Sequence, residues 1–184
     1  MHAETVAGDR HAVRWVLPGS SLPSGRLREA PGALGALLAA GTLQEVRTEP
    51  HGVTMRLAEG RTWRDEGDPV RAALAAALDE VGAWVVEPDE DGTLVRVAQD
   101  VLAGPVGDYV RSHGGLVTVT GAHDGILALV FDGACSGCPA SGVTLHSRIE
   151  SAVRERYPAV REVRDTSAGR PARSVTLWPR LRRP

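Results

Sequence analysis

The chain has 184 residues, a hydrophobic content of 42% and a formal net charge of -2. This length suits one ordinary domain or two small ones, and the hydrophobic content is typical of a folded protein rather than a disordered one. The weak net charge gives no electrostatic reason to expect nucleic acid or an acidic membrane as a partner. Residues 1–14 contain no apolar signal-peptide core, so we expect a cytoplasmic, soluble protein.

Residues 1–86 are expected to form a first small domain that mixes helices and strands. The predicted elements are a strand at 11–17, a helix from Ala33 to Gly41, strands at 43–47 and 53–57, and a helix from Asp68 to Val81. Turn-forming residues between the two central strands predict a hairpin. The last helix should begin with Asp68 as N-cap and Pro69 in the first turn, where the missing N–H costs nothing.

Residues 87–96 are acidic and contain proline and glycine, which predicts a linker between two domains. After it we expect a helix at 97–112 that Gly104-Pro105 could break, strands at 116–120 and 126–131, a helix at 140–156 and a strand at 160–163. Residues 97–169 are thus predicted to form a second α+β domain with the order helix, hairpin, cysteine loop, helix and strand. The basic tail, 170–184, is expected to be solvated. The predicted fold class is α+β with two small domains.

Cys135 and Cys138 are the only two cysteines in the chain. They lie three positions apart in a loop of small residues between a predicted strand and a predicted helix. In a reducing compartment, such a pair is more typical of a metal or redox site than of a structural disulfide. Two thiolates supply half of the four ligands that a tetrahedral zinc site or an iron–sulfur cluster takes. A second copy of the chain, paired by a two-fold axis, could supply the other two.

The C-x-x-C spacing alone leaves three kinds of function open. The alternatives to an iron–sulfur site are a thioredoxin-like dithiol oxidoreductase and a zinc-stapled dimeric interaction module. The identity of the bound metal would separate them. We expect His113 to sit at a helix end near the last carbonyl groups and His146 to lie on the surface, so neither is assigned a metal. Ser136 and Ser141 have no evident histidine and carboxylate partners, which argues against nucleophilic catalysis.

The run Gly133-Ala134-Cys135-Ser136-Gly137-Cys138-Pro139-Ala140-Ser141 has the form G-A-C-x-x-C-P-x-S. Further motifs in the same register are Gly114-Gly115, Thr144-Leu145, Ile149-Glu150 and Pro158-x-Val160-x-Glu162-Val163. Together they resemble the C-terminal domain of the NifU family, the Nfu-type iron–sulfur cluster carriers, over residues 97–164. Residues 1–86 resemble the Nfu N-terminal domain more weakly, through Leu17-Pro18-Gly19 and through Trp63 ahead of a helix.

The resemblance implies a cluster carrier rather than an enzyme. It implies a homodimer that binds one 4Fe-4S cluster between two subunits through Cys135 and Cys138. The expected partners are an upstream cluster-assembly scaffold and apo iron–sulfur recipient proteins, with no nucleic acid and no membrane. The family delivers its cluster to apo-proteins, and we expect the same of this chain.

Overall fold

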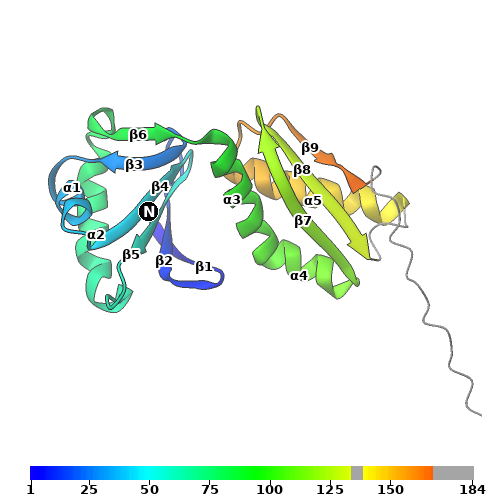
Figure 1. Cartoon of the computed structure of the whole chain (residues 1–184), viewed down its shortest axis with the longest axis horizontal. Coiled ribbons are helices and arrows are strands. Elements are labelled where there is room, and N and C mark those ends of the chain that lie inside the picture. Colours follow the sequence, from blue (N-terminus) through cyan, green and yellow to red (C-terminus); the bar gives the residue numbers. More distant parts are fainter. Residues whose placement is uncertain (134–138, 168–184) are drawn as a thin grey trace, which may run out of the picture.

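The computed structural model describes residues 1–133 and 139–167, which form two sheets with helices packed on them (Figure 1). The first sheet has the strand order β1-β2-β5-β4-β3-β6, and all its pairs are antiparallel. Its strands are β1 (His2–Val6), β2 (Asp9–Val16), β3 (Gly25–Glu29), β4 (Leu43–Glu49), β5 (Gly52–Leu57) and β6 (Val85–Pro88). The helices of this part are α1 (Gly32–Ala39), α2 (Trp63–Leu78) and the short 3-10 helix η1 (Val81–Ala83).

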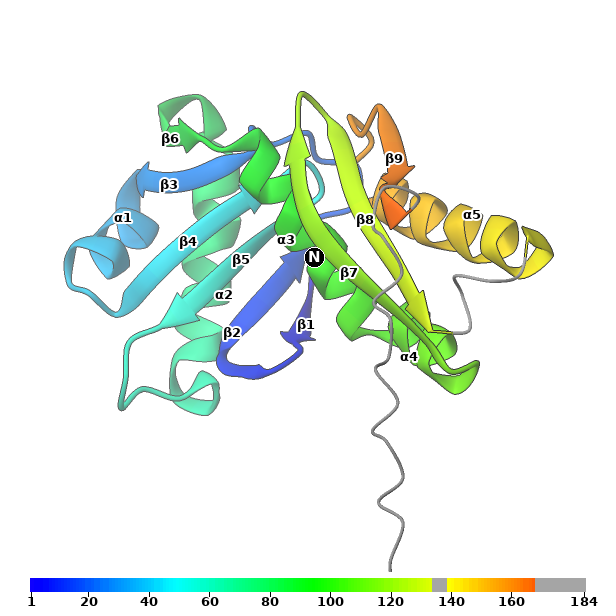
Figure 2. The same ribbon diagram turned by 45° about the vertical axis from the view of Figure 1, so that its right-hand side comes forward.

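The second sheet has the order β7-β8-β9, with β7 and β8 antiparallel and β8 and β9 parallel. Its strands are β7 (Gly115–His123), β8 (Ile126–Gly133) and β9 (Glu162–Asp165), and its helices are α3 (Glu90–Ala103), α4 (Pro105–Ser112) and α5 (Pro139–Arg156). Figure 2 shows this sheet in front of α5, with the first sheet beside it. The predicted α+β class is confirmed. Within the described part of the chain, no helix combines the length and apolarity that crossing a bilayer requires.

Strand alternation gives the first sheet one apolar face and one charged face. Val13 and Trp15 of β2 stand opposite Met55 and Val53 of β5, and these residues belong to the core that α1 and α2 cover. Successive side chains of a strand point to opposite faces. Arg14 therefore lies on the other face of the first sheet. That face is turned toward the second sheet and its helices.

Helix α2 begins at Trp63, five residues before the predicted start at Asp68. The reason is a tertiary contact: the Trp63 ring meets Trp15 edge-on at 6.3 Å, and its Nε1–H donates to the His11 carbonyl oxygen at 2.9 Å. These contacts fix the first turn of α2. Two acidic residues in that turn also stabilise it by interacting with the positive end of the helix dipole. Pro69 consequently lies inside the helix rather than in its first turn.

The expectation that residues 87–96 form a linker is wrong for most of that stretch. Strand β6 ends at Pro88, and α3 begins at Glu90 with Asp89 as its N-cap. The Asp89 carboxylate accepts a hydrogen bond from the Gly92 N–H at 3.0 Å. Leu94 is fully buried, so the acidic residues are a helix N-terminus and not a solvated connection.

Two separate clusters of buried side chains support a division of the chain near residue 89, which we keep as a proposal. The first cluster runs from Trp15 to Trp84 and the second from Leu94 to Val163. In the second, Leu127 and Leu129 of β8 are fully buried with Ile149 of α5. Each cluster joins one sheet to its own helices, as expected of a small domain.

Two further expectations concern the second sheet and its helices. The break at Gly104-Pro105 is confirmed, because Pro105 is the first residue of α4. The last strand lies at Glu162–Asp165 rather than 160–163. Val160 is buried, but its N–H bonds the Tyr157 carbonyl oxygen at 3.1 Å, so it closes the turn after α5 instead of joining the sheet.

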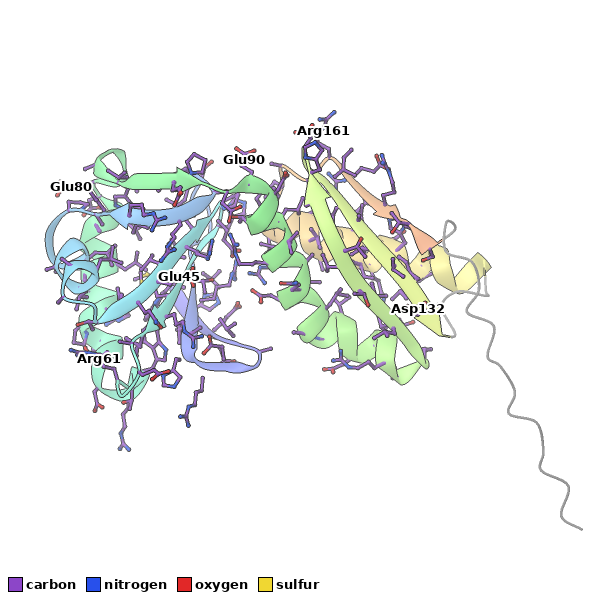
Figure 3. All side chains as sticks on the ribbon, viewed as in Figure 1. Glu45, Arg61, Glu80, Glu90, Asp132 and Arg161 are labelled. Atoms are coloured by element: carbon purple, nitrogen blue, oxygen red, sulfur yellow. The ribbon has the colours of Figure 1, made fainter. Side chains whose placement is uncertain are left out.

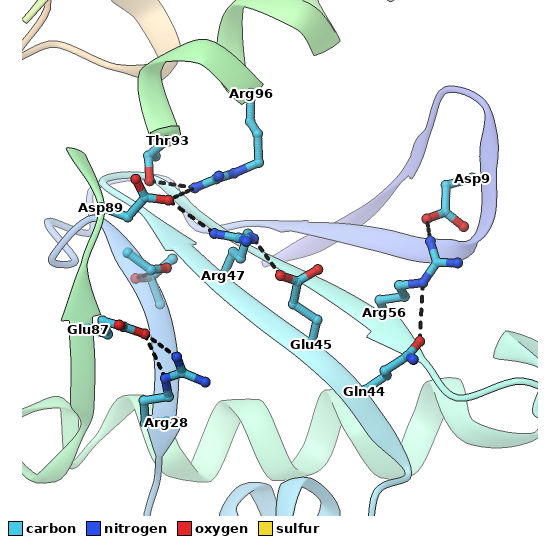
Figure 4. A network of polar contacts seen from close by, with 12 residues as sticks. Asp9, Arg28, Gln44, Glu45, Arg47, Arg56, Glu87, Asp89, Thr93 and Arg96 are labelled. Atoms are coloured by element: carbon cyan, nitrogen blue, oxygen red, sulfur yellow. Dashed lines mark hydrogen bonds and ion pairs between the residues drawn. The ribbon is translucent and has the colours of Figure 1, made fainter. Parts of the chain in front are cut away.

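A first charged contact between the two parts surrounds Asp89 (Figure 4). Arg47 of β4 and Arg96 of α3 both donate to Asp89 Oδ2, at 3.2 and 3.1 Å. Partial burial works against ionisation, but the hydrogen bond and charge of Arg96, the Gly92 N–H and the charge of Arg47 together hold the pKa of Asp89 below its usual value. Asp89 thus ties the start of α3 to the first sheet.

A second contact is buried and centred on Glu49, at the end of β4. Arg14 donates its Nε–H to Glu49 Oε1, and Arg156 of α5 donates from Nη2 to both Glu49 oxygens at 3.2 and 3.1 Å. Arg156 Nη2 also lies 3.3 Å from Asp100 Oδ2 of α3. Burial raises the pKa of Asp100, and the nearby Arg156 offsets this only in part.

The opposite pKa shifts predict opposite effects of Asp89→Asn and Asp100→Asn on the free energy of unfolding. The lowered pKa of Asp89 stabilises the folded chain above the unfolded-state pKa near 3.8, and this is lost as the pH falls through the folded-state pKa. The raised pKa of Asp100 costs stability once the pH has risen past its folded-state value. At pH 7 we expect Asp89→Asn to lose about 0.5–1 kcal/mol and Asp100→Asn to gain about 0.5 kcal/mol.

Urea unfolding at pH 7 and at a series of lower pH values measures both effects. Asparagine caps a helix as well as aspartate does, so Asp89→Asn removes the charge and keeps the cap. Below the folded-state pKa of Asp89, the free energy of unfolding of Asp89→Asn should equal that of the unmodified chain. Equal losses in both variants at pH 7 would contradict the assignment.

Candidate functional site

The candidate site is the segment between the end of β8 and the start of α5. Strand β8 ends at Gly133 and α5 begins at Pro139, so both entrances to the segment are described. Cys135 and Cys138 themselves lie outside the described residues, as does the tail, 170–184. Asp132, labelled in Figure 3, is an exposed residue of β8 directly before Gly133.

Gly133 controls how the chain leaves β8. Its φ is +69°, a left-handed backbone conformation that glycine adopts without strain. It stands opposite Gly115 of β7, and a Cβ at position 133 would lie 2.6 Å from the carbonyl oxygen of Gly114. The absence of a Cβ on Gly133 therefore allows the end of β8 to approach the turn between α4 and β7 closely.

Both elements that flank the segment are anchored in the second core. Phe131 is buried, its N–H donates to Ser167 Oγ at 2.7 Å, and its carbonyl oxygen accepts from the same hydroxyl at 3.2 Å. On α5, Leu145 and Ile149 are buried against the sheet. The start of α5 at Pro139 confirms that this proline occupies the first helical turn. A helix N-terminus offers free N–H groups and a positive dipole end, which favour thiolate over thiol.

The two histidines nearest the segment have structural contacts. His113 Nδ1 lies 2.9 Å from the Tyr109 carbonyl oxygen, which confirms that His113 sits at the end of a helix and contacts one of its last carbonyls. His146 is half-buried, with its ring 6.2 Å from that of Phe131. Among residues 1–133 and 139–167, no three His, Cys, Asp or Glu side chains converge in a way that could hold a metal ion.

Residues 99–164 match the NifU-like domain family. A protein of Vesicomyosocius okutanii named Fe/S biogenesis protein NfuA is 34% identical over 82 residues, which is 44% of this chain and 43% of the relative. A protein of the same name from Xanthomonas euvesicatoria is 36% identical over 81 residues, 44% of this chain and 41% of the relative. The chain thus spans about two fifths of the length of the curated relatives it matches.

The matched region includes the whole second sheet apart from the end of β9, with the C-terminal end of α3 and all of α4 and α5. It also includes both cysteines and the Gly-Gly pair whose contact with Gly133 is described above. The resemblance noted from the motifs at 97–164 is confirmed for this domain. The weaker likeness of residues 1–86 to the Nfu N-terminal domain stays a prediction.

Proposed function

Because residues 99–164 match the NifU-like domain family, we propose that this chain is an iron–sulfur cluster carrier. One observation carries the proposal: the matched region contains the only cysteine pair of the chain, set between the end of β8 and the start of α5. Named relatives described as Fe/S biogenesis proteins support it. The cluster is the cargo of the protein and not a group that assists a reaction, so the chain acts as a carrier rather than an enzyme.

Cys135 and Cys138 are the proposed cluster ligands. Two thiolates per chain fill half of the four-thiolate set that a 4Fe-4S cluster takes. A homodimer, with one pair from each subunit, completes the set with identical loops. No additional ligand from the histidines is needed in this arrangement.

Delivery would proceed by ligand exchange at iron. A thiolate of the recipient protein binds one iron while the Cys135 or Cys138 thiolate leaves that iron, one bond at a time. No electrons are exchanged, and the departing thiolate takes a proton or stays ionised. We propose an upstream assembly scaffold as the source of the cluster and apo iron–sulfur proteins as recipients, with the first domain serving as a docking module.

Anaerobic reconstitution of the full chain with ferrous iron, sulfide and a thiol tests the proposal. We expect a broad absorption band in the visible range, about two irons and two sulfides per chain, and a shift from monomer to dimer in sedimentation. A colourless monomer under these conditions would overturn it. Tight zinc without iron would favour the zinc-stapled module, and turnover of a disulfide substrate would favour the oxidoreductase.

A further inference from the structure

Helices α4 and α5 share an exposed cluster formed by Tyr109, His113 and Arg148, which we call the α4–α5 patch. The Arg148 guanidinium carbon lies 4.4 Å from the centre of the Tyr109 ring. The His113 ring lies 4.5 Å from the same ring. Tyr109 is 36% exposed although it is a large aromatic residue. The patch therefore offers an aromatic surface with a cation held against it.

Arg148 differs from neighbouring arginines in having no carboxylate partner among the residues that the structure describes. Arg111 forms an ion pair with Asp108, and Arg154 forms one with Glu150, both at 2.6 Å. In the part of the chain that the structure describes, no acidic side chain lies within ion-pair distance of Arg148. Stacking on Tyr109 restricts the guanidinium plane and leaves its N–H edges free. Such an edge suits a carboxylate, which it can bind through two parallel hydrogen bonds.

The patch adjoins one entrance to the cysteine segment and lies further along α5 from the other. His113 directly precedes Gly114, whose carbonyl oxygen lies against Gly133 at the end of β8. Arg148 lies on α5, whose first residue is Pro139, so it is about 14 Å along the helix axis from the other entrance. A protein that brings a thiolate to the segment would thus pass close to the patch.

We propose that the α4–α5 patch docks an acidic segment of the recipient protein, a step that rests on the proposed carrier function. A carboxylate of that segment pairs with Arg148 while an apolar side chain packs on Tyr109. Tyrosine and arginine are the residue types that most often dominate the binding energy of protein interfaces. The patch holds no carboxylate that could pair with Arg148 of a second copy, which favours a foreign acidic partner.

Binding of a short peptide tests the docking step without any cluster. The probe is a fluorescent twelve-residue peptide that places a leucine between aspartates, with a second version in which every aspartate is asparagine. The cluster-free full chain is titrated in low salt and fluorescence anisotropy is read. We expect Arg148→Ala to weaken binding of the acidic peptide about five- to tenfold and Arg148→Glu to abolish it. The amide peptide should bind weakly and equally to all variants.

Arg164→Ala is the matched control, because Arg164 is an exposed arginine of β9 that pairs with Glu162 at 2.9 Å. It removes the same charge and should leave peptide binding unchanged. Equal affinity of the unmodified chain and Arg148→Ala, or no binding by the unmodified chain, would overturn the proposal. A loss of dimer in Arg148→Ala would also overturn it and assign the patch to a second copy.

Cluster loading separates this proposal from the proposed function. Arg148→Ala should take up as much iron and sulfide as the unmodified chain, but should transfer its cluster more slowly to an apo-protein with an acidic cysteine loop. If the unmodified chain binds the acidic peptide yet never loads a cluster, the carrier function fails while the docking surface stands. If it loads a cluster and Arg148→Ala transfers it at the same rate, the docking surface fails alone.

Discussion

Cys135→Ser and Cys138→Ser should each lose the cluster completely. A serine hydroxyl is a poor ligand for cluster iron, and each substitution removes two of the four proposed ligands from a dimer because both subunits carry it. We therefore expect loss of the visible absorption band, loss of bound iron and sulfide, and loss of cluster-dependent dimer, all three together. Absorption, metal analysis and sedimentation on the same anaerobic sample measure this.

Ser136→Ala is the control for this pair of variants, because it changes a residue inside the same segment and keeps both thiols. It should load iron as the unmodified chain does. Retention of colour and iron by either cysteine variant would contradict the assignment of the ligands. Loss of iron with the dimer intact would show that the subunits associate without the cluster, and a shared cluster would then need a separate test.

The second domain was more predictable from the sequence than the first. The Asp-Gly turn, the Gly104-Pro105 break and the Pro139 helix start each depend on local chemistry, and all three are found as predicted. The hairpin strands extend further than predicted, to Gly115 and Gly133. The sequence also predicts Cys135 and Cys138 as the site, and this stays a prediction.

The first domain depends more on contacts between distant residues. Strands β1 and β6 lie at the edges of the sheet and carry mostly exposed side chains, so no alternation of apolar and polar residues predicts them. Strand β3 is not predicted because Leu27 is its one large apolar residue, so its five residues show no apolar alternation. The start of α2 is fixed by the contact of Trp63 with Trp15, which no local pattern contains. The sequence predicts the charged face of the first sheet only in part. The contacts of its charged side chains depend on α3 and α5, which pack against that face.

Glu49→Gln should destabilise the folded chain more than any other substitution of a single charged residue discussed above. The Glu49 and Arg14 side chains are each only 7% exposed, and that of Arg156 is 19% exposed. Glu49 is the carboxylate that both arginines share. With glutamine in its place, Arg14 keeps only the more exposed Glu4 and Arg156 keeps only Asp100 as carboxylate partners. Removing one partner of a buried ion pair costs about 3–5 kcal/mol, and these remaining pairs should place the loss at the lower end of that range.

The stability lost in Glu49→Gln should be traceable to one contact between the two cores. Arg156 belongs to α5 and Glu49 to β4, so their contact joins the two cores. In a chain that already carries Glu49→Gln, we expect the further change Arg156→Met to recover about 1–2 kcal/mol, because it removes one of the two largely buried cations that Glu49 neutralises. Denaturant unfolding of the two single variants and the double variant gives this coupling. Each core should be monitored separately, with tryptophan fluorescence for the first and backbone amide exchange for the second.

Glu162→Gln provides the matched control, because Glu162 pairs with Arg164 on the surface, where both side chains are about half exposed. An exposed pair of this kind contributes little, so we expect almost no change in the free energy of unfolding. The effect of Glu49→Gln should also persist in 0.5 M salt, since buried pairs are screened far less than exposed ones. A loss as small as that of the control would mean that water reaches Glu49 in solution and that the two cores are not joined through it.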